Sequence, residues 1–347
     1  MESKRVLSIQ SHVVHGYVGN KSALFPLQLH NFEVDSINSV QLSCHTQYAH
    51  CTGQVLSSEH LKSIYDSLRL NGSASYDALL TGYVGDPNLL IQLAEIAAGI
   101  KSATPHCDPV IGDNGHIYVP KDLVPIYREK ILPIADVLLP NQFEAELLTG
   151  CKITDEDSVF HCIDVLHSTH SIPTIILSST ELFFEDEQGL KQLATYISYR
   201  PDLAVLRKRG EFNGDLCQKG KETSEIKSFS ICAILRVTPQ RVRALYPKLE
   251  ATFFGTGDLF SSLTLIYFEK HGGNVDIRKA LYKIQCTMHA VLKRTLDYAE
   301  NLNSGQPVAN PANIMQKSDR YELRLIQSAK DILDPPEYAS IQVTSLQ

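Results

Sequence analysis

The chain has 347 residues, of which 43% are hydrophobic and 20% charged, ordinary proportions for a globular protein and enough for one large α/β domain. Its net charge of −7 argues against nucleic acid or an anionic membrane surface as the main partner. No apolar run is long enough for a membrane helix, and the eight cysteines form no close C-x-x-C pair, so we expect reduced thiols in a cytoplasmic protein.

Short apolar runs alternate with longer amphipathic stretches over the first half of the chain. This alternation predicts an α/β fold with a mainly parallel sheet and helices on both faces. The expected strands are Val6–Gln10, Glu33–Ile37, Tyr76–Thr81, Asp136–Leu139 and Thr174–Ser178. The expected helices are Asn20–Leu29, Ser58–Leu70, Pro87–Ile100, Pro120–Ile131, Gln142–Leu148 and Glu156–His167.

The region from 185 to 250 breaks this alternation. Leu193–Tyr199 is expected to be an edge strand, whereas residues 200–225 are rich in Lys, Arg, Gly and Glu. That composition predicts a surface insertion and not a second domain. Its basic stretch Arg207–Arg209 is then a solvated loop, with a localisation signal or an anion patch as the alternatives. Strand pairing is expected to resume near Ile231–Val237.

Two long helices are expected to complete the core, at Leu259–Lys270 and Val275–Asn301. Residues 303–313 form a linker rich in Gly, Pro and Asn, and the remaining residues are expected to dock as a tail. We therefore predict a single domain over 1–347, with an insertion at about 200–225 and a C-terminal docking tail at 303–347.

The sequence Gly255-Thr256-Gly257-Asp258 lies between an apolar run and the first of these two helices. Two glycines let the backbone adopt positive φ and approach a ligand closely. The N–H groups of the first helical turn have no internal partner, and the helix dipole adds positive charge there. The motif therefore predicts an anion hole for a phosphate. By itself it leaves open whether Asp258 is a helix N-cap or a catalytic base.

Several polar residues follow expected strands, among them Ser11, Gly82-Tyr83, Asn141 and Ser178-Ser179. Each could be a simple turn or cap. In open α/β sheets, however, ligands bind outside the carboxyl ends of the strands. The shared position of these residues favours a functional site.

Further motifs occur in order along most of the chain, apart from about residues 181–248. They are Val6–Val13, Gly16–Asn20, Asn38–Gln41, His45-Thr46, Tyr48–His50, Leu80–Tyr83, Cys107–Val110, Tyr118–Pro120, Pro140–Glu146, Leu325–Ser328 and Asp331-Ile332. Together with the glycine motif they resemble the eukaryotic pyridoxal kinases of the ribokinase-like superfamily. The resemblance implies a three-layer ribokinase-like fold and a homodimer. It also implies ATP-dependent phosphorylation of the 5′-hydroxymethyl group of pyridoxal, pyridoxine and pyridoxamine, as in vitamin B6 salvage.

The resemblance gives roles to the catalytic and vitamin-binding residues. Asp258 would be the base, and the N–H groups of Gly255, Thr256 and Gly257 would stabilise the transferred phosphoryl group. Ser11 would hydrogen-bond the pyridine ring. The other residues implied to line the vitamin pocket are Thr46, Tyr83, Val18 and Val40.

The same resemblance implies Mg²⁺ with ATP and a monovalent cation, K⁺ or Na⁺, near Ser178 and Ser179. Asp108, Asp113 and Glu144 are the hard oxygen ligands that Mg²⁺ prefers, directly or through water. Without the resemblance, Glu144 would be interpreted as a surface residue. The implied nucleotide contacts are Asp108, Asp113, Tyr118, Asn141, Ser178, Ser179, Leu249, Ala251, Thr256 and Gly257.

Two departures from the family pattern lie beside the expected metal site. Residues 102–106 are polar and contain Pro105, so we expect a shortened strand with Asp108 still at the carboxyl edge of the sheet. Residues 114–117 are few for a flap over phosphates. These two departures are compatible with three interpretations of the chain: an active but trimmed enzyme, a faulty gene model, or a pseudokinase that binds vitamin or nucleotide. A further alternative is a kinase for another small alcohol, such as hydroxymethylpyrimidine or a sugar.

Overall fold

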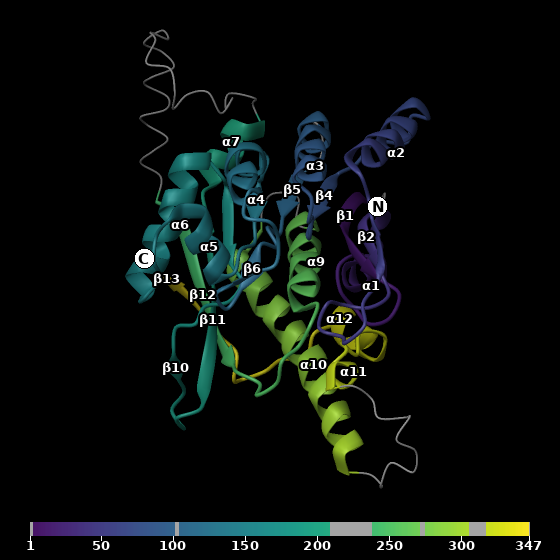
Figure 1. Cartoon of the computed structure of the whole chain (residues 1–347). Helices are drawn as coiled ribbons and strands as arrows, with labels where there is room; N and C mark the ends of the chain where they lie inside the picture. The colour runs from purple at the N-terminus through teal and green to yellow at the C-terminus, as the bar shows by residue number, and fades with distance from the viewer. Residues whose placement is uncertain (1–2, 101–103, 209–237, 271–274, 305–316, 347) are drawn as a thin grey trace, which may run out of the picture.

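The computed structural model describes residues 3–100, 104–208, 238–270, 275–304 and 317–346, and one large sheet forms its centre (Figure 1). Neighbouring strands run parallel in the order β2 (Glu33–Leu42), β1 (Arg5–Val13), β4 (Ala78–Thr81), β5 (Thr104–Cys107), β8 (Val137–Leu138) and β9 (Thr174–Leu177). Antiparallel strands extend the sheet beyond them, namely β3 (Gly53–Val55) beside β2, and then β11 (Lys191–Tyr199), β12 (Gln240–Pro247) and β13 (Gln342–Leu346) beside β9. A short strand, β10 (Phe184–Glu185), pairs with β11.

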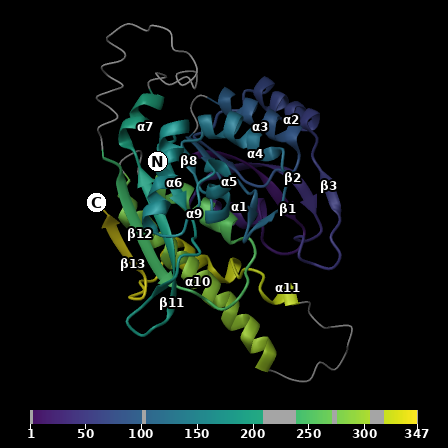
Figure 2. The same ribbon diagram turned by 60° about the vertical axis from the view of Figure 1, so that its left-hand side comes forward.

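Helices cover both faces of the sheet (Figure 2). One face carries α1 (Asn20–Leu29), α9 (Thr256–Glu269), α10 (Ile277–Ser304) and α12 (Ala329–Leu333). The other carries α2 (Ser58–Leu70), α3 (Pro87–Gly99), α4 (Leu123–Ile126), α5 (Gln142–Thr149) and α6 (Glu156–His170). Further helical segments are the 3₁₀ turns Leu132–Ile134 and Ile326–Ser328, α7 (Pro201–Lys208) and α11 (Lys317–Arg320). Within the described ranges, no helix combines the length and apolarity needed to cross a bilayer.

Successive residues of the central strands enter different cores, because alternate side chains of a strand point to opposite faces. In β1, Leu7 and Ile9 belong to the core that includes α2 and α3, whereas Val6 belongs to the core that includes α1 and α9. The side chains of β4 are distributed in the same way, with Leu79 in the first core and Leu80 in the second. Burial on both faces confirms the predicted three-layer α/β architecture.

Most expected elements are present, and α1 and α2 have the predicted bounds. The helix expected at Pro120–Ile131 is shorter and irregular. It begins as α4 at Leu123 and ends in the π-helical turn Tyr127–Ile131. Pro125 has no N–H group to donate to the carbonyl of Lys121, so a regular helix cannot extend back to Pro120, and Pro125 instead lies in the first turn of α4.

The prediction of an edge strand at Leu193–Tyr199 is wrong. β11 lies inside the sheet, hydrogen-bonded to β9 on one side and to β12 on the other. Ala194, Tyr196 and Ile197 have no exposed surface, as expected for an inner strand. The outer neighbours β12 and β13 come from distant parts of the chain, so the local pattern could not reveal them.

Residues 201–208, the first part of the predicted insertion, form α7 and not the expected loop. Arg207 is not solvated. Its guanidinium donates to three backbone carbonyl oxygens at 2.9 to 3.0 Å, those of Pro133, His170 and Ser171. The rest of the predicted insertion, the strand expected at Ile231–Val237 and residues 305–313 of the linker lie outside the described residues.

The shortened strand predicted before Asp108 is present as β5, and the N–H of Asp108 still donates to the carbonyl of Thr81 at 3.0 Å. The polar residue in this strand has a buried partner. His106 Nε2 lies 3.6 Å from Glu269 Oε1, and the other oxygen of Glu269 accepts the Lys4 ammonium at 2.8 Å. The Glu269 carboxylate is therefore the polar neighbour of a histidine that lies in a central parallel strand.

Replacing Glu269 by Gln should destabilise the fold. Burial alone would raise the pKa of Glu269. The His106 ring and the Lys4 ammonium outweigh burial and lower this pKa from 4.5 to about 2. A depressed folded-state pKa means that the carboxylate contributes about 3 kcal/mol of stability above its ordinary pKa, and that this contribution is lost as the pH falls towards the folded-state pKa. Urea unfolding at neutral pH should show the loss in E269Q, and the difference should shrink below pH 4.5. Equal free energies of unfolding at neutral pH would refute this assignment.

Candidate functional site

Polar residues collect where the parallel strands end. β1, β4, β5, β8 and β9 are successive neighbours in the sheet. Ser11 lies two residues before the end of β1, and Tyr83, Asp108, Asn141 and Ser178 follow the ends of the other four strands in the same order. This is the edge of an open α/β sheet at which ligands bind, so the expectation drawn from strand positions agrees with the fold.

The predicted anion hole is a turn at Gly255, directly before α9. The φ of Gly255 is 73°, and a Cβ there would overlap the carbonyl oxygen of Tyr17, so both backbone shape and space require glycine. Its own carbonyl oxygen accepts the Ser22 hydroxyl and the N–H of Leu259, each at 3.1 Å. The N–H groups of the first turn of α9 therefore sit on a fixed backbone, as an anion site needs.

Asp258 lies in the first turn of α9 and is not its N-cap, which is Gly255. The backbone N–H of Gly19, the residue before α1, acts on the Asp258 carboxylate and lowers its pKa. Burial raises the pKa of Asp258, although the hydrogen bonds from Gly19 and from its own N–H partly offset this effect. A carboxylate with a raised pKa beside an anion hole is suited to accept a proton from a hydroxyl group.

Asp108 faces this anion hole from the end of β5. It is buried, and a Cβ placed on Gly257 would lie 3.5 Å from its Oδ2 atom. Burial raises the pKa of Asp108 well above its ordinary value, and the negative charges of Glu144 and Asp258 raise it further. The charges of Glu144 and Asp258 therefore act on Asp108, and repulsion among these carboxylates favours a bound cation.

Glu144 is not a surface residue, since its exposed fraction is 3%. Its Oε1 accepts the N–H of Ile111 at 2.8 Å, and its Oε2 accepts the N–H of Asn141 at 3.0 Å in a capping box at the start of α5. Burial nonetheless raises the pKa of Glu144, with a further contribution from the charge of Asp113. The capping box thus fixes an acidic side chain beside Asp108.

The segment expected to be a flap is a complete two-stranded hairpin, β6 (Gly112–Asp113) and β7 (His116–Ile117). Asn114 and Gly115 have φ values of 49° and 79°, as a two-residue turn between antiparallel strands requires. Tyr118, just beyond the hairpin, is 54% exposed. The hairpin is short but intact, and Asn141 Nδ2 donates to the Gly112 carbonyl at 2.8 Å, which ties the hairpin to the start of α5.

The acidic residues fit a divalent cation that is shared with phosphates. Among the described residues, no set of three His, Cys, Asp or Glu side chains forms a complete metal cage. Mg²⁺ usually takes one or two carboxylates and completes its shell with water and substrate phosphates. Asp108 and Glu144, both buried and both with a raised pKa, match that requirement.

The expected vitamin-binding residues come from three segments near the Gly255 turn. β2 carries one extra residue opposite β1, since Gln10 pairs with Asn38 and His12 with Gln41. Ser11 and Val40 lie at this irregularity, and Val40 is buried. Val18 lies against Gly255, and Tyr83 follows β4. Thr46 is exposed in the loop after β2, where the adjacent His45 ring stacks on Phe254.

The expected nucleotide-binding residues lie on the β9 side of the anion hole. Ser178 donates its N–H to the Pro140 carbonyl at 2.9 Å, and the Ser179 carbonyl accepts the N–H of Gln142 at 3.2 Å. These bonds place both serines beside Asn141. Leu249 and Ala251 form a tight turn between β12 and α9, with the Ala251 N–H donating to the Leu249 carbonyl at 2.9 Å.

Sequence reasoning missed two residues at this edge of the sheet. The N–H of Gly19 lowers the pKa of Asp258, and only the place of Gly19 in the motif Gly16–Asn20 could have drawn attention to it. Thr180 follows the two serines after β9, and its buried hydroxyl has no hydrogen-bond partner. No sequence pattern marks that threonine.

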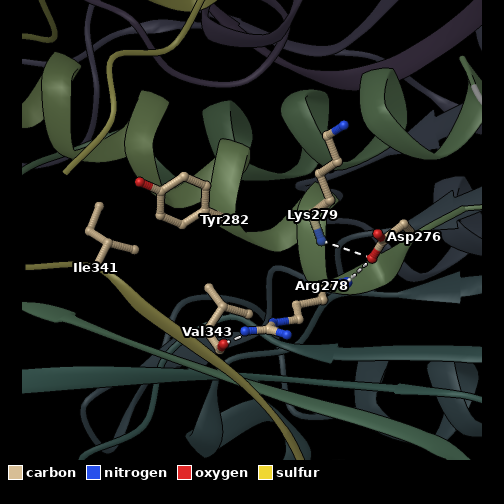
Figure 3. Close-up of a pocket in the computed structure, with 6 residues that line it drawn as sticks. All are labelled: Asp276, Arg278, Lys279, Tyr282, Ile341 and Val343. Atoms are coloured by element: carbon tan, nitrogen blue, oxygen red, sulfur yellow. Dashed lines mark hydrogen bonds between the residues drawn. The ribbon is translucent and has the colours of Figure 1, made fainter. Parts of the chain in front are cut away.

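A separate pocket lies between α10 and β13 (Figure 3). The guanidinium of Arg278 there donates to the Val343 carbonyl at 3.1 Å, and the Asp276 carboxylate accepts the backbone N–H groups of Arg278 and Lys279. The lining also includes Tyr282 and Ile341 but none of the predicted site residues. We assign no function to this pocket.

Known proteins resemble the chain over nearly its whole length. Residues 42–196 match the family model for phosphomethylpyrimidine kinase. The chain is 41% identical to a pyridoxal kinase of Ovis aries and 40% identical to one of Homo sapiens, with 96% of each chain covered in both cases. A solved pyridoxal kinase from Leishmania donovani, in complex with ADP and pyridoxine, matches with a TM-score of 0.77, 29% identity and full coverage of both chains. The chain therefore belongs to the pyridoxal kinase family and has its ribokinase-like fold.

Proposed function

We propose that the chain catalyses ATP-dependent phosphorylation of pyridoxal, and also of pyridoxine and pyridoxamine, as a step of vitamin B6 salvage. The observation that carries the proposal is the position of Asp108 beside Gly257, at the glycine-rich N-terminus of α9 that also bears Asp258. It occurs in a chain that is 41% identical to a pyridoxal kinase along 96% of its length.

The residues of the α9 turn would carry out the transfer. Asp258 accepts the proton of the 5′-hydroxyl group while that oxygen forms a bond to the γ-phosphorus of ATP. The bond between this phosphorus and the oxygen bridging to the β-phosphate breaks, and ADP leaves. The N–H groups of Gly255, Thr256 and Gly257 donate to the transferred phosphoryl group, which needs positioning and charge stabilisation more than strong deprotonation.

We assign Asp108, Asp113 and Glu144 to the divalent cation, Mg²⁺, which neutralises phosphate charge when bound with ATP. A monovalent cation, K⁺ or Na⁺, would bind near Ser178 and Ser179, where the unpartnered hydroxyl of Thr180 supplies a further oxygen. The remaining proposed nucleotide contacts are Tyr118, Asn141, Leu249, Ala251, Thr256 and Gly257.

On the vitamin side, Ser11 would hydrogen-bond the pyridine ring, and Val18, Val40, Tyr83 and Thr46 would line the pocket. Apolar walls with a few placed polar groups suit a flat aromatic ring. The match of residues 42–196 to phosphomethylpyrimidine kinase makes hydroxymethylpyrimidine the alternative substrate. A coupled ADP-release assay should show turnover that depends on pyridoxal. The same assay should show little turnover with hydroxymethylpyrimidine or a sugar. The reverse preference would refute the proposed substrate.

Replacing Asp258 by Asn should lower kcat about 10²–10⁴-fold, which is the usual contribution of a positioned acid or base. ATP binding should persist, because the backbone of the anion hole is unchanged. Steady-state kinetics and ATP titration of the same preparation would separate the two effects. Turnover close to that of the wild type would remove Asp258 from the mechanism.

Replacing Glu144 by Gln should raise the Mg²⁺ concentration needed for half-maximal activity about 10–100-fold. Gln can keep the capping box, so the start of α5 should stay intact. Glu146→Gln is the matched control, because Glu146 lies on the same helix and pairs with Lys152. Since burial raises the pKa of Glu144 and Asp108, protons should also compete with Mg²⁺ above the ordinary carboxylate range. Equal Mg²⁺ dependence of both variants would contradict the assignment.

We also propose a cytoplasmic homodimer in which each active site lies largely within one subunit. Closed two-fold dimers are the commonest assemblies of soluble proteins. Light scattering at micromolar concentration should therefore give about twice the 38.6 kDa mass of the chain. A monomer mass would rule out this part of the proposal.

A further inference from the structure

Glu322, which follows α11, belongs to none of the motifs assigned above, yet its side chain is only 11% exposed. Glutamate is seldom buried unless its oxygens are paired. In Glu322 both carboxylate oxygens have partners. Oε2 accepts the backbone N–H of Tyr17 at 2.9 Å. Oε1 lies 2.9 Å from the Tyr48 hydroxyl, whose single proton it shares with Asp319, and 3.3 Å from Nε2 of His45. A single carboxylate thus holds two loops on the vitamin side of the site.

The carboxylate of Glu322 also packs directly on the backbone before Tyr17. Gly16 has a φ of 85°, and a Cβ there would overlap the carboxylate of Glu322. The close approach requires glycine at this position. The segment 16–17 therefore rests on Glu322 through a hydrogen bond and through van der Waals contact.

Two chains of contact run from Glu322 to the turn that forms the anion hole. In the first, the N–H of Tyr17 binds Glu322, while the carbonyl of Tyr17 packs against Gly255. In the second, His45 lies beside Glu322 and stacks on Phe254, with ring centroids 4.2 Å apart and an interplanar angle of 27°. Both chains end at the two residues that directly precede Thr256.

The charge of Glu322 suits this arrangement. Burial alone would raise the pKa of Glu322, but the contacts from His45, Tyr48 and the Tyr17 N–H lower it below the ordinary value. The side chain is therefore an anion near neutral pH. Hydrogen bonds to a charged acceptor are about twice as strong as neutral ones, so the Tyr17 peptide is held firmly.

We propose that Glu322 is a positioning residue, which fixes the Gly255 turn relative to the loop 16–18 on the vitamin side. Its kinetic consequence rests on the proposed kinase function, whereas its structural consequence does not. Phosphoryl transfer requires the γ-phosphate and the acceptor hydroxyl to be held in line, and a shift of about 1 Å can cost on the order of 10²-fold in rate. Glu322 would set that spacing without touching either substrate.

Asp319 provides a matched control from the same C-terminal segment. Its Oδ1 accepts the Tyr48 hydroxyl at 2.7 Å and lies 2.7 Å from Nε2 of His15. It shares one partner with Glu322, but within the described part of the chain its hydrogen bonds and ion pairs reach neither the Tyr17 peptide nor the His45 ring. Asp319→Asn should therefore test the effect of losing an acidic residue at this place without loss of the proposed chains of contact.

Hydrogen–deuterium exchange of the ligand-free protein tests the structural part. Glu322→Ala should increase exchange at two separated segments, 16–19 and 254–258, whereas Asp319→Asn should change exchange near His15 and residues 45–50 but not at 254–258. If Glu322→Ala does not fold, Glu322→Asp replaces it, because the shorter side chain cannot reach Tyr17 and Tyr48 together. Unchanged exchange at 254–258 in a folded Glu322 variant would overturn the inference, whatever the activity of the protein.

Steady-state kinetics test the proposed effect of Glu322 on phosphoryl transfer. Glu322→Asp and Glu322→Ala should lower kcat with pyridoxal about 10–100-fold, with a smaller change in the dissociation constant of ATP. Glu322→Gln keeps an acceptor for the Tyr17 N–H and should recover most of the loss. A wild type without any turnover on pyridoxal would count against the proposed function alone. Wild-type kcat in folded Glu322→Ala, or a loss in Asp319→Asn equal to that in Glu322→Ala, would overturn the positioning role.

Discussion

Placing several carboxylates in one buried site is the constraint on which the rest of the structure depends. Asp108, Glu144 and Asp258 lie together at the carboxyl edge of the sheet, and burial raises the pKa of each of them. Their repulsion is offset only in part by backbone N–H groups, among them those of Ile111, Asn141 and Gly19. A site of this kind favours the binding of a cation, and the adjacent helix N-terminus favours the binding of a phosphate.

The topology explains how distant residues reach this one place. Parallel strands end at the same edge, so Asp108 after β5 and Asn141 after β8 become neighbours although they lie far apart in sequence. α9 comes from much later in the chain and packs against α1, where the hydroxyl of Ser22 holds the carbonyl of Gly255. The backbone shape at Gly255 and the packing of Tyr17 on it bring the anion hole to the carboxylates.

Much of the fold and the site could be predicted because their signals are local. The glycines before Asp258, the capping sequence Asn141–Glu144 and the alternation of strands and helices each act within a few residues. The predictions that were wrong concerned residues whose environment depends on segments distant in sequence. The inner position of β11 depends on β12 and β13, and the burial of Arg207 depends on carbonyl groups from other segments. The part played by Glu322 likewise appears only when the C-terminal segment lies on the loop at Tyr17.

A crystal structure with Mg²⁺, a non-hydrolysable ATP analogue and pyridoxal would test the central claim most directly. The account predicts the γ-phosphate on the N–H groups of the Gly255 turn, the cation between the phosphates and Asp108, and the 5′-hydroxyl group beside Asp258. It would be contradicted if the phosphates bound away from the Gly255 turn, or if the vitamin lay with its hydroxymethyl group pointing away from Asp258.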